Sequence, residues 1–242
     1  MKIIAASQIK RIHYGYFIGP ADHPLEGQPI PVSGFLVPHS GGTLLFDTGM
    51  SPADDEVRER YHPRLQTAPE ALATIGAGAK DIDRIANCHL HVDHAGNNYL
   101  FPDTPVLVQE AELRAAKEPD FTFPHLTFEY PGSALEVIDG ETDVAPGLRL
   151  VPTPGHTPGH QSLLVDTDAG RWLLAGQASN STWEFSSQAF AERIAAAGHE
   201  PIGTFPDWMP HLREWGVTRA FFAHDLLVWD RDETDLGHPT PA

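Results

Sequence analysis

Apolar and polar positions alternate along the first part of the chain, a pattern that predicts β-strands. The alternation covers residues 3–17, and the segments 34–37 and 43–46 form a predicted hairpin around His39-Ser40-Gly41-Gly42. The segment 19–32 contains four prolines, so we expect it to be a loop. Other short apolar runs predict strands at residues 82–88, 105–108, 148–151, 162–165, 172–175 and 219–223.

Helices are predicted between these strands from their start and stop signals. Ser51-Pro52-Ala53-Asp54 and Thr67-Ala68-Pro69-Glu70 each combine a capping residue, an early proline and an acidic residue three positions later. Further helices are predicted at residues 110–117, 187–197 and 205–215, the last interrupted near Pro210. No linker is long enough to divide the chain and no fixed-period repeat occurs, so we expect a single domain over residues 1–242.

An aromatic segment, residues 119–131, connects a predicted helix to the following strands. It carries Phe121, Phe123, Phe128 and Tyr130. Two interpretations are open: a satellite hydrophobic cluster beneath a long loop, or a wall that faces a substrate.

The charge balance excludes several kinds of partner. The chain has 33 acidic and 16 basic residues and a net charge of −17, without a basic stripe. Nucleic acid and anionic membranes are therefore not expected as partners. The single cysteine, Cys88, cannot form an intrachain disulfide. The N-terminal apolar run is too short for a signal peptide, and no run could span a bilayer, so we expect a cytoplasmic protein.

The chemistry centres on His89-Leu90-His91-Val92-Asp93-His94, which follows the predicted strand 82–88. His89 and His91 are two positions apart, so on extended backbone they point to the same side. Asp93 and His94 lie on the following loop and can turn toward a neighbouring point. Imidazole and carboxylate groups suit zinc and similar divalent ions. The motif therefore predicts two metal half-sites side by side, as in a two-metal hydrolytic centre.

Two further segments place histidines after predicted strands. Pro154-Gly155-His156-Thr157-Pro158-Gly159-His160 follows the strand 148–151, and His224 follows the strand 219–223. Ligands held at the ends of separate strands can be fixed rigidly in geometry.

These motifs, together with Phe46-Asp47-Thr48-Gly49 and the segment 221–225, resemble the metallo-β-lactamase fold superfamily and come in its order. The segment Tyr16-Phe17-Ile18-Gly19 and the Asp47-Thr48-Gly49-Met50 sequence before a helix are most similar to the N-acyl-homoserine lactonase branch. The resemblance implies an α/β fold, an αββα sandwich. It also implies two metals, usually zinc, at one edge of the sheets, and hydrolysis by a bridging hydroxide; the departure at Gln177 described below leaves one or two zinc ions as the expectation.

The resemblance also implies a role for each matching residue. The first metal would be held by His89, His91 and His156, and the second by Asp93, His94 and His224. Asp93 also counts among the candidate catalytic residues. Asp47 would accept a hydrogen bond from a ligand histidine. His160 is expected to brace a turn rather than bind metal.

The sequence departs from the family pattern at two places. Where the family has an aspartate that bridges both metals, this chain has Gln177, whose amide carries no negative charge. We therefore count Gln177 as a metal ligand of the second site and expect that site to be weak. Where the lactonases have a tyrosine that contacts the substrate, this chain has the candidate catalytic residue Asn180, which has no acidic proton to give.

The function expected from this pattern is metal-dependent hydrolysis of a small lactone or ester. One alternative is a thioester hydrolase of the glyoxalase II type. Another is a catalytically weak relative that binds a metal or ligand, because Gln177 replaces the bridging aspartate.

Overall fold

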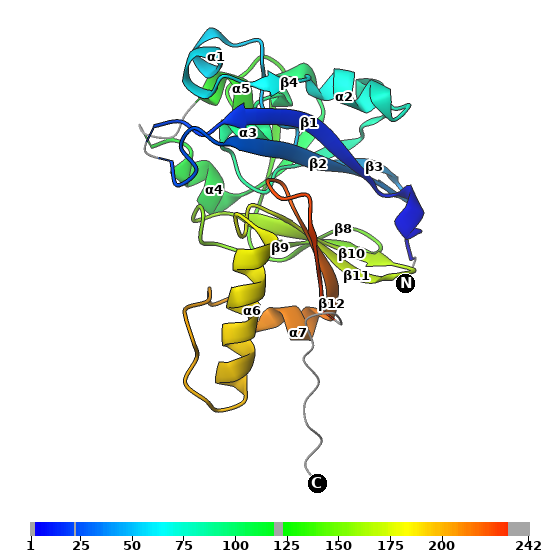
Figure 1. Cartoon of the computed structure of the whole chain (residues 1–242). Helices are drawn as coiled ribbons and strands as arrows, with labels where there is room; N and C mark the ends of the chain where they lie inside the picture. The colour runs from blue at the N-terminus through cyan, green and yellow to red at the C-terminus, as the bar shows by residue number, and fades with distance from the viewer. Residues whose placement is uncertain (1–2, 22, 119–122, 232–242) are drawn as a thin grey trace.

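Two β-sheets stacked face to face, with helices on both outer surfaces, form the body of the protein (Figure 1). The computed structural model describes residues 3–21, 23–118 and 123–231. The first sheet has the order β4 (Arg64–Leu65), β1 (Lys10–Ile18), β2 (Pro29–His39), β3 (Gly42–Phe46), β5 (Arg84–Ala86), β6 (Pro105–Gln109) and β7 (Ala134–Ile138). The second has the order β13 (Val228–Asp230), β12 (Val217–Phe222), β11 (Gly170–Gly176), β10 (Gln161–Thr167), β9 (Leu148–Pro152) and β8 (Thr142–Ala145).

The helices of the described residues are short except for one. They are α1 (Asp55–Tyr61), α2 (Ala68–Thr74), α3 (Val92–Ala95), α4 (Glu110–Ala115), α5 (Pro124–Thr127), α6 (Thr182–Ala196) and α7 (His211–Trp215), with 3-10 turns at Ala6–Gln8, Ala79–Asp81 and Asn98–Leu100. None of these helices is long and apolar enough to cross a membrane.

Three apolar layers hold the four-layer arrangement together. Between the sheets, side chains such as Val37 and Phe46 from the first sheet pack with Leu163 and Leu174 from the second. Outside the first sheet, a separate cluster joins its strands to α2, and outside the second sheet α6 and α7 pack on β11 and β12. Burying apolar area on both faces of each sheet is the main stabilising contribution to such a fold. The expected αββα sandwich is confirmed.

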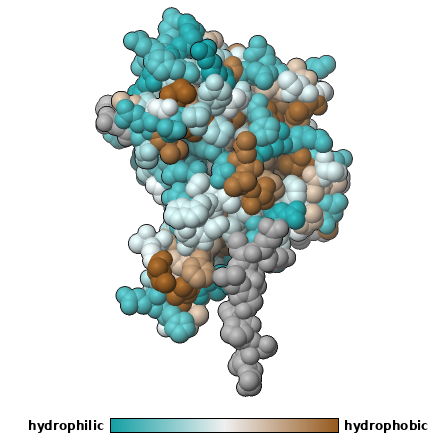
Figure 2. All heavy atoms as spheres, in the orientation of Figure 1, coloured by the Kyte–Doolittle hydropathy of each residue, from teal (hydrophilic) through white to brown (hydrophobic). Residues whose placement is uncertain are grey.

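The surface is mostly polar, as the acidic composition requires. In the view of Figure 2, apolar residues form small patches separated by hydrophilic ones. The most exposed large apolar side chains include Trp183, Ile202 and Leu227.

The structure corrects the expectation that residues 19–32 form a loop throughout. Strand β2 already begins at Pro29, and Pro29 and Pro31 pair with Ile18 and Tyr16 of β1. The pairing of β2 with β3 covers only residues 35–39, so among the described residues the proline part of β2 pairs with a strand on one side only. Proline, which lacks an N–H, is tolerated where a strand has a free edge.

Helix starts were predicted with mixed success. The capping box of Thr67 and Glu70 is present at the start of α2. The preceding helix is capped by Asp54 instead of Ser51, and Asp54 Oδ1 accepts a 3.0 Å hydrogen bond from the Val57 amide. Helix α6 begins at Thr182, five positions before the predicted Ser187, because Ser181 caps it.

The aromatic segment belongs largely to the interior. Phe123 and Phe128 are 4% and 5% exposed, and Phe128 packs in a cluster with Leu90 and Val108. Helix α5, which the sequence analysis did not predict, turns these rings inward. Phe121 lies outside the described residues. Burial of both rings favours the satellite cluster over a substrate-facing wall.

Candidate metal centre

Both sheets contribute polar side chains to one region, and each side chain lies just after a strand. His89 to His94 follow β5 of the first sheet, while His156, Gln177 and His224 follow β9, β11 and β12 of the second. The turn after β5 is held by the carbonyl of His94. That carbonyl accepts hydrogen bonds from the backbone amides of Thr48 and Gly49 at 2.8 and 3.1 Å, and from Asn87 Nδ2 at 3.1 Å.

His89, His91 and His156, which we call the first cluster, lie close together. The ring centroids of His91 and His156 are 4.5 and 4.7 Å from that of His89, and 5.0 Å from each other. His91 Nδ1 and His156 Nε2 are 3.1 Å apart. One potential ligand atom from each of the three lies within 4.8 Å of the others.

Asp93, His94, His224 and Gln177, which we call the second cluster, meet at a neighbouring point. His94 Nε2 lies 3.0 Å from His224 Nε2 and 3.0 Å from Gln177 Oε1. Asp93 Oδ2 lies 3.1 Å from His224 Nε2 and 3.4 Å from His94 Nε2. The structure thus brings together all seven residues that the sequence analysis grouped as ligands. His89 and His94 join the two clusters, with ring centroids 4.3 Å apart.

The donor set fits a divalent cation of the zinc type. Donors around one tetrahedral zinc lie about 3.3 Å apart, because zinc–nitrogen distances are about 2.0–2.1 Å. The separations of 3.0–3.4 Å in the second cluster match that spacing. In the first cluster, the buried atom His89 Nε2 has no hydrogen-bond partner within the described residues. A buried polar atom without a partner is costly, and a cation would satisfy it.

The environment of the first cluster favours neutral imidazoles, which are the form that binds a metal. Burial, reinforced by the neighbouring histidines, lowers the pKa of His89 well below 6.5. Desolvation by the surrounding protein lowers the pKa of His91, and lowers that of His156 to about 3 even though this side chain reaches the surface.

The second cluster is electrostatically different. Burial alone would raise the pKa of Asp93, but His94 and His224 hold it well below its usual value, so Asp93 is an anion. Burial would lower the pKa of His94, but electrostatic interactions with the side chains of Cys88, Asp93 and Asp47 raise it well above 6.5.

Groups behind the imidazoles determine which ring nitrogen faces the cluster. His94 Nδ1 lies 3.0 Å from Asp47 Oδ2, and His224 Nδ1 donates to the carbonyl of Pro31 at 2.7 Å. Both contacts leave Nε2 directed into the second cluster. Asp47 therefore lies where it can accept a hydrogen bond from His94, one of the expected ligand histidines.

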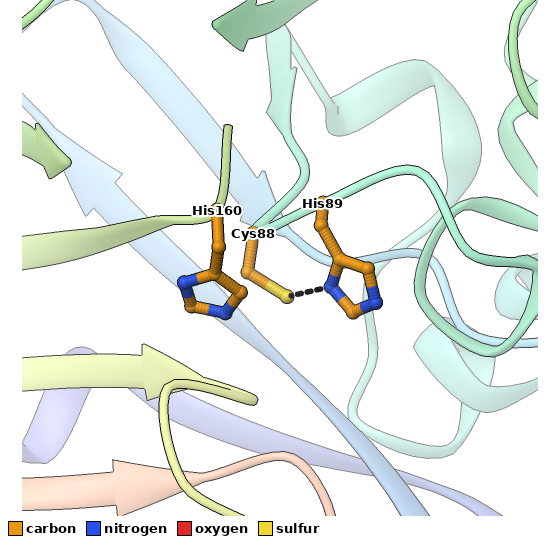
Figure 3. A group of neighbouring side chains, drawn as sticks. All are labelled: Cys88, His89 and His160. Carbon is orange, nitrogen blue, oxygen red and sulfur yellow. Dashed lines mark hydrogen bonds between the residues drawn. The ribbon is translucent and has the colours of Figure 1, made fainter. Parts of the chain in front are cut away.

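His160 is near the clusters but both of its ring nitrogens are engaged elsewhere. Its Nε2 accepts the backbone N–H of Gln177 at 3.1 Å, and its Nδ1 lies 2.9 Å from the hydroxyl of Thr153. These contacts agree with the expectation that His160 braces a turn and does not bind a metal. Figure 3 shows His160 beside Cys88 and His89, with the dashed contact running from the sulfur to His89.

Sequence analysis missed a carboxylate that joins two ligand segments. Glu112 in α4 is 1% exposed, and its Oε1 accepts the Leu90 amide at 2.9 Å. Its Oε2 accepts the hydroxyl of Thr157 at 2.6 Å. Leu90 lies between His89 and His91, and Thr157 follows His156. A glutamate within the predicted helix 110–117 gives no signal for this role.

Asn180 lies at the rim of the centre. Its Oδ1 accepts a 3.2 Å hydrogen bond from Gln177 Nε2, and its backbone amide donates to Glu184 Oε2 at 2.8 Å. A cavity of about 380 Å³ opens here, lined by residues that include His156, Gln177, Asn180, Glu184 and Trp208.

Comparison with known proteins points to one family. Residues 27–182 match the family described as the metallo-beta-lactamase superfamily. An N-acyl homoserine lactonase of a Bacillus species is 35% identical over 219 residues, which cover 84% of this chain and 84% of that protein. The enzyme of the same description from Bacillus cereus is 32% identical over 213 residues, covering 81% and 82%.

Solved structures agree with these sequence matches. A variant of AiiA from Bacillus thuringiensis, with N-decanoyl-L-homoserine bound at its active site, superposes with a TM-score of 0.70. The identity is 25%, and the match covers 93% of this chain and 95% of that one. These relatives are lactonase hydrolases, in agreement with the expectation of a metallo-hydrolase. The fold, the order of the motifs and the sequence matches lead to one conclusion: this chain belongs to the metallo-beta-lactamase superfamily.

Proposed function

We propose that the protein is a zinc-dependent hydrolase that opens small lactones, N-acyl homoserine lactones among them. The observation that carries the proposal is the convergence of seven ligand-type side chains, from both sheets, into two adjoining clusters. The sequence relatives described as N-acyl homoserine lactonases support the substrate class.

Each cluster would hold one metal ion. His89, His91 and His156 would bind the first, and Asp93, His94 and His224 the second, with Gln177 contributing a neutral oxygen. A zinc ion bound there lowers the pKa of its water to about 7 and polarises a substrate carbonyl. The residues around it hold the imidazoles in one orientation, and Asp93, kept ionised, supplies negative charge to the second cluster.

Gln177 makes the second site the weaker one. Its oxygen lies 3.0 Å from His94 Nε2, and the family resemblance implies a bridging aspartate at this position of the sequence. Two cations about 3.5–4 Å apart repel one another, and a neutral amide offsets that repulsion less than a carboxylate. We therefore expect one tightly bound and one loosely bound metal.

The cavity beside Asn180 would receive the substrate. It carries Glu184 and adjoins His156 and Gln177. A cavity with a carboxylate favours a neutral substrate over an anionic one. Asn180 can donate a hydrogen bond to a carbonyl or to the leaving oxygen but cannot give up a proton.

A second candidate is a relative that binds a metal or ligand without turnover, which Gln177 favours. The two are separated by measuring the metal content of the purified protein and its hydrolysis of lactones, esters and thioesters. We expect zinc to be bound and lactones to be opened. Bound zinc without turnover of any member of the panel would support the second candidate.

Substitution of the first cluster gives a sharper test. His91→Ala and His156→Ala should abolish lactone hydrolysis and lower the melting temperature in the presence of zinc, because a bound metal stabilises the folded state. His199→Ala, at an exposed position, is the control and should change neither. Unchanged turnover in both cluster variants, with metal content verified, would contradict the proposed function.

A further inference from the structure

Cys88 is a fully buried side chain that contacts one histidine from each cluster. Its sulfur lies 3.2 Å from His89 Nδ1 and 3.2 Å from His94 Nδ1, and its exposure is 0%. Both contacts are made on the sides of the rings that carry Nδ1. The thiol therefore sits behind the two clusters and not within either of them.

The position of the single N–H of a neutral His89 ring determines which atom can accept a hydrogen bond from it. A neutral imidazole carries one N–H, and the nitrogen that binds a metal must be the bare one. If His89 Nε2, which is buried without a hydrogen-bond partner, is the bare nitrogen that faces the metal, the proton lies on Nδ1. The sulfur of Cys88 lies within reach of that N–H. His94 differs, since the carboxylate of Asp47 lies 3.0 Å from its Nδ1 and is the stronger acceptor.

The same contacts argue against a third metal site formed by Cys88, His89 and His160, the group drawn in Figure 3. His160 Nε2 already accepts the Gln177 amide. With its Nδ1 beside the hydroxyl of Thr153, His160 has no nitrogen left for a cation.

The place of the sulfur is fixed by close packing against β11. A Cβ added at Gly176 would lie 2.3 Å from Cys88 Cβ and 2.6 Å from its sulfur, and Gly176 has a φ of +57°. Only glycine allows this approach of backbone to thiol. Gln177 of the second cluster is the next residue, so the packing aligns Cys88 with both clusters.

We propose that Cys88 is a positioning residue of the metal centre, whose sulfur accepts a hydrogen bond from His89 Nδ1–H and holds His89 Nε2 toward the first metal. This inference rests on the proposed metal-dependent function. Partners behind metal-binding histidines fix the tautomer and the ring orientation, and their loss typically costs about 10–100-fold in metal affinity. The usual partners are oxygen atoms, and here sulfur takes their place.

Cys88→Ala and Cys88→Ser test the hydrogen bond, with zinc affinity measured by competition against a chromogenic chelator. We expect Cys88→Ala to weaken the tighter zinc site by about tenfold or more. Cys88→Ser restores an acceptor and should recover most of the loss. Val165→Ala creates a comparable cavity in the same apolar layer and should lower the melting temperature of the metal-free protein without changing zinc affinity.

Histidine ¹⁵N chemical shifts of the metal-free wild-type protein provide a measurement that needs neither metal nor activity. The inference requires His89 to carry its proton on Nδ1, and a proton found on Nε2 would overturn it even if the alanine variant fails to fold. Equal zinc affinity in wild type and Cys88→Ala would overturn the inference while leaving the proposed function intact. A wild-type protein that binds no zinc would overturn both.

Discussion

The side-chain amide of Gln177 is oriented with its oxygen 3.0 Å from His94 Nε2 and its nitrogen donating to Asn180 Oδ1 at 3.2 Å. The two positions at which the sequence analysis expects a departure from the family pattern are therefore hydrogen-bonded to each other. Asn180 holds the NH₂ group away from the second cluster, so that the only face of Gln177 presented to a cation is an acceptor.

Adding a charge at Gln177 should strengthen the second metal site. Gln177→Glu keeps the length of the side chain and supplies an anion beside His94, so we expect the metal content after dialysis to rise toward two ions per chain. Gln188→Glu is the control, because it adds the same charge to the rim of the same cavity. Metal content is measured by inductively coupled plasma mass spectrometry. Equal metal content in Gln177→Glu and wild type would show that position 177 does not supply the bridging anion.

Asn180→Tyr should raise kcat for lactones if departure of the ring oxygen limits the rate. A phenol can give a proton to that oxygen, whereas an amide cannot. Asn180→Phe provides the matched ring without the hydroxyl. A higher kcat in the tyrosine variant alone supports the role, and equal rates in both variants would assign the effect to ring contact.

Phe128→Ala should destabilise the protein by about 3–5 kcal/mol, the usual cost of emptying a buried aromatic site. Phe128 is 5% exposed and packs with Leu90 and Val108, so KM of the folded fraction should change little. Trp183→Ala, at a position that is 79% exposed, should leave the melting temperature nearly unchanged. A large rise in KM with full stability would instead restore the interpretation of a substrate wall.

Glu112→Ala should affect stability and the first cluster together. The substitution leaves the buried Leu90 amide and Thr157 hydroxyl without their acceptor, and each unsatisfied group costs about 1–3 kcal/mol. We expect a lower melting temperature and weaker zinc binding, read by denaturation and chelator competition. Glu110→Ala is the control on the same helix, since Glu110 is exposed. If Glu112→Ala lowers the melting temperature but leaves the zinc affinity unchanged, Glu112 has a structural role only.

The sequence was most informative where chemistry is encoded locally. The spacing of His89, His91, Asp93 and His94 after an apolar run predicted both clusters. The local structure differs from the expectation, because β5 ends at Ala86 and Asp93 and His94 lie in α3 and not on a loop. The capping box at Thr67 was equally local. Strands β4 and β13, with two and three residues, are too short to show an alternation. Strands β7 and β8 were also missed, although they are as long as strands that were predicted.

What escaped prediction depends on contacts between distant segments. Glu112 meets Leu90 and Thr157 only because α4 follows β6 alongside the two ligand segments. The role of Cys88 depends on the approach of Gly176 from the other sheet. Pro29 and Pro31 were assigned to a loop because no local signal shows that one side of β2 lacks a partner there.

The division of ligands between the two sheets has a consequence for how the protein matures. His89 to His94 arrive with the first half of the chain, whereas His156, Gln177 and His224 arrive with the second. The first cluster needs His156 after β9 and the second needs His224 after β12, so each cluster is complete only when segments of both sheets have met. Zinc would then be acquired by the finished fold, and selection for tight metal binding would also act on the accuracy with which the two sheets meet.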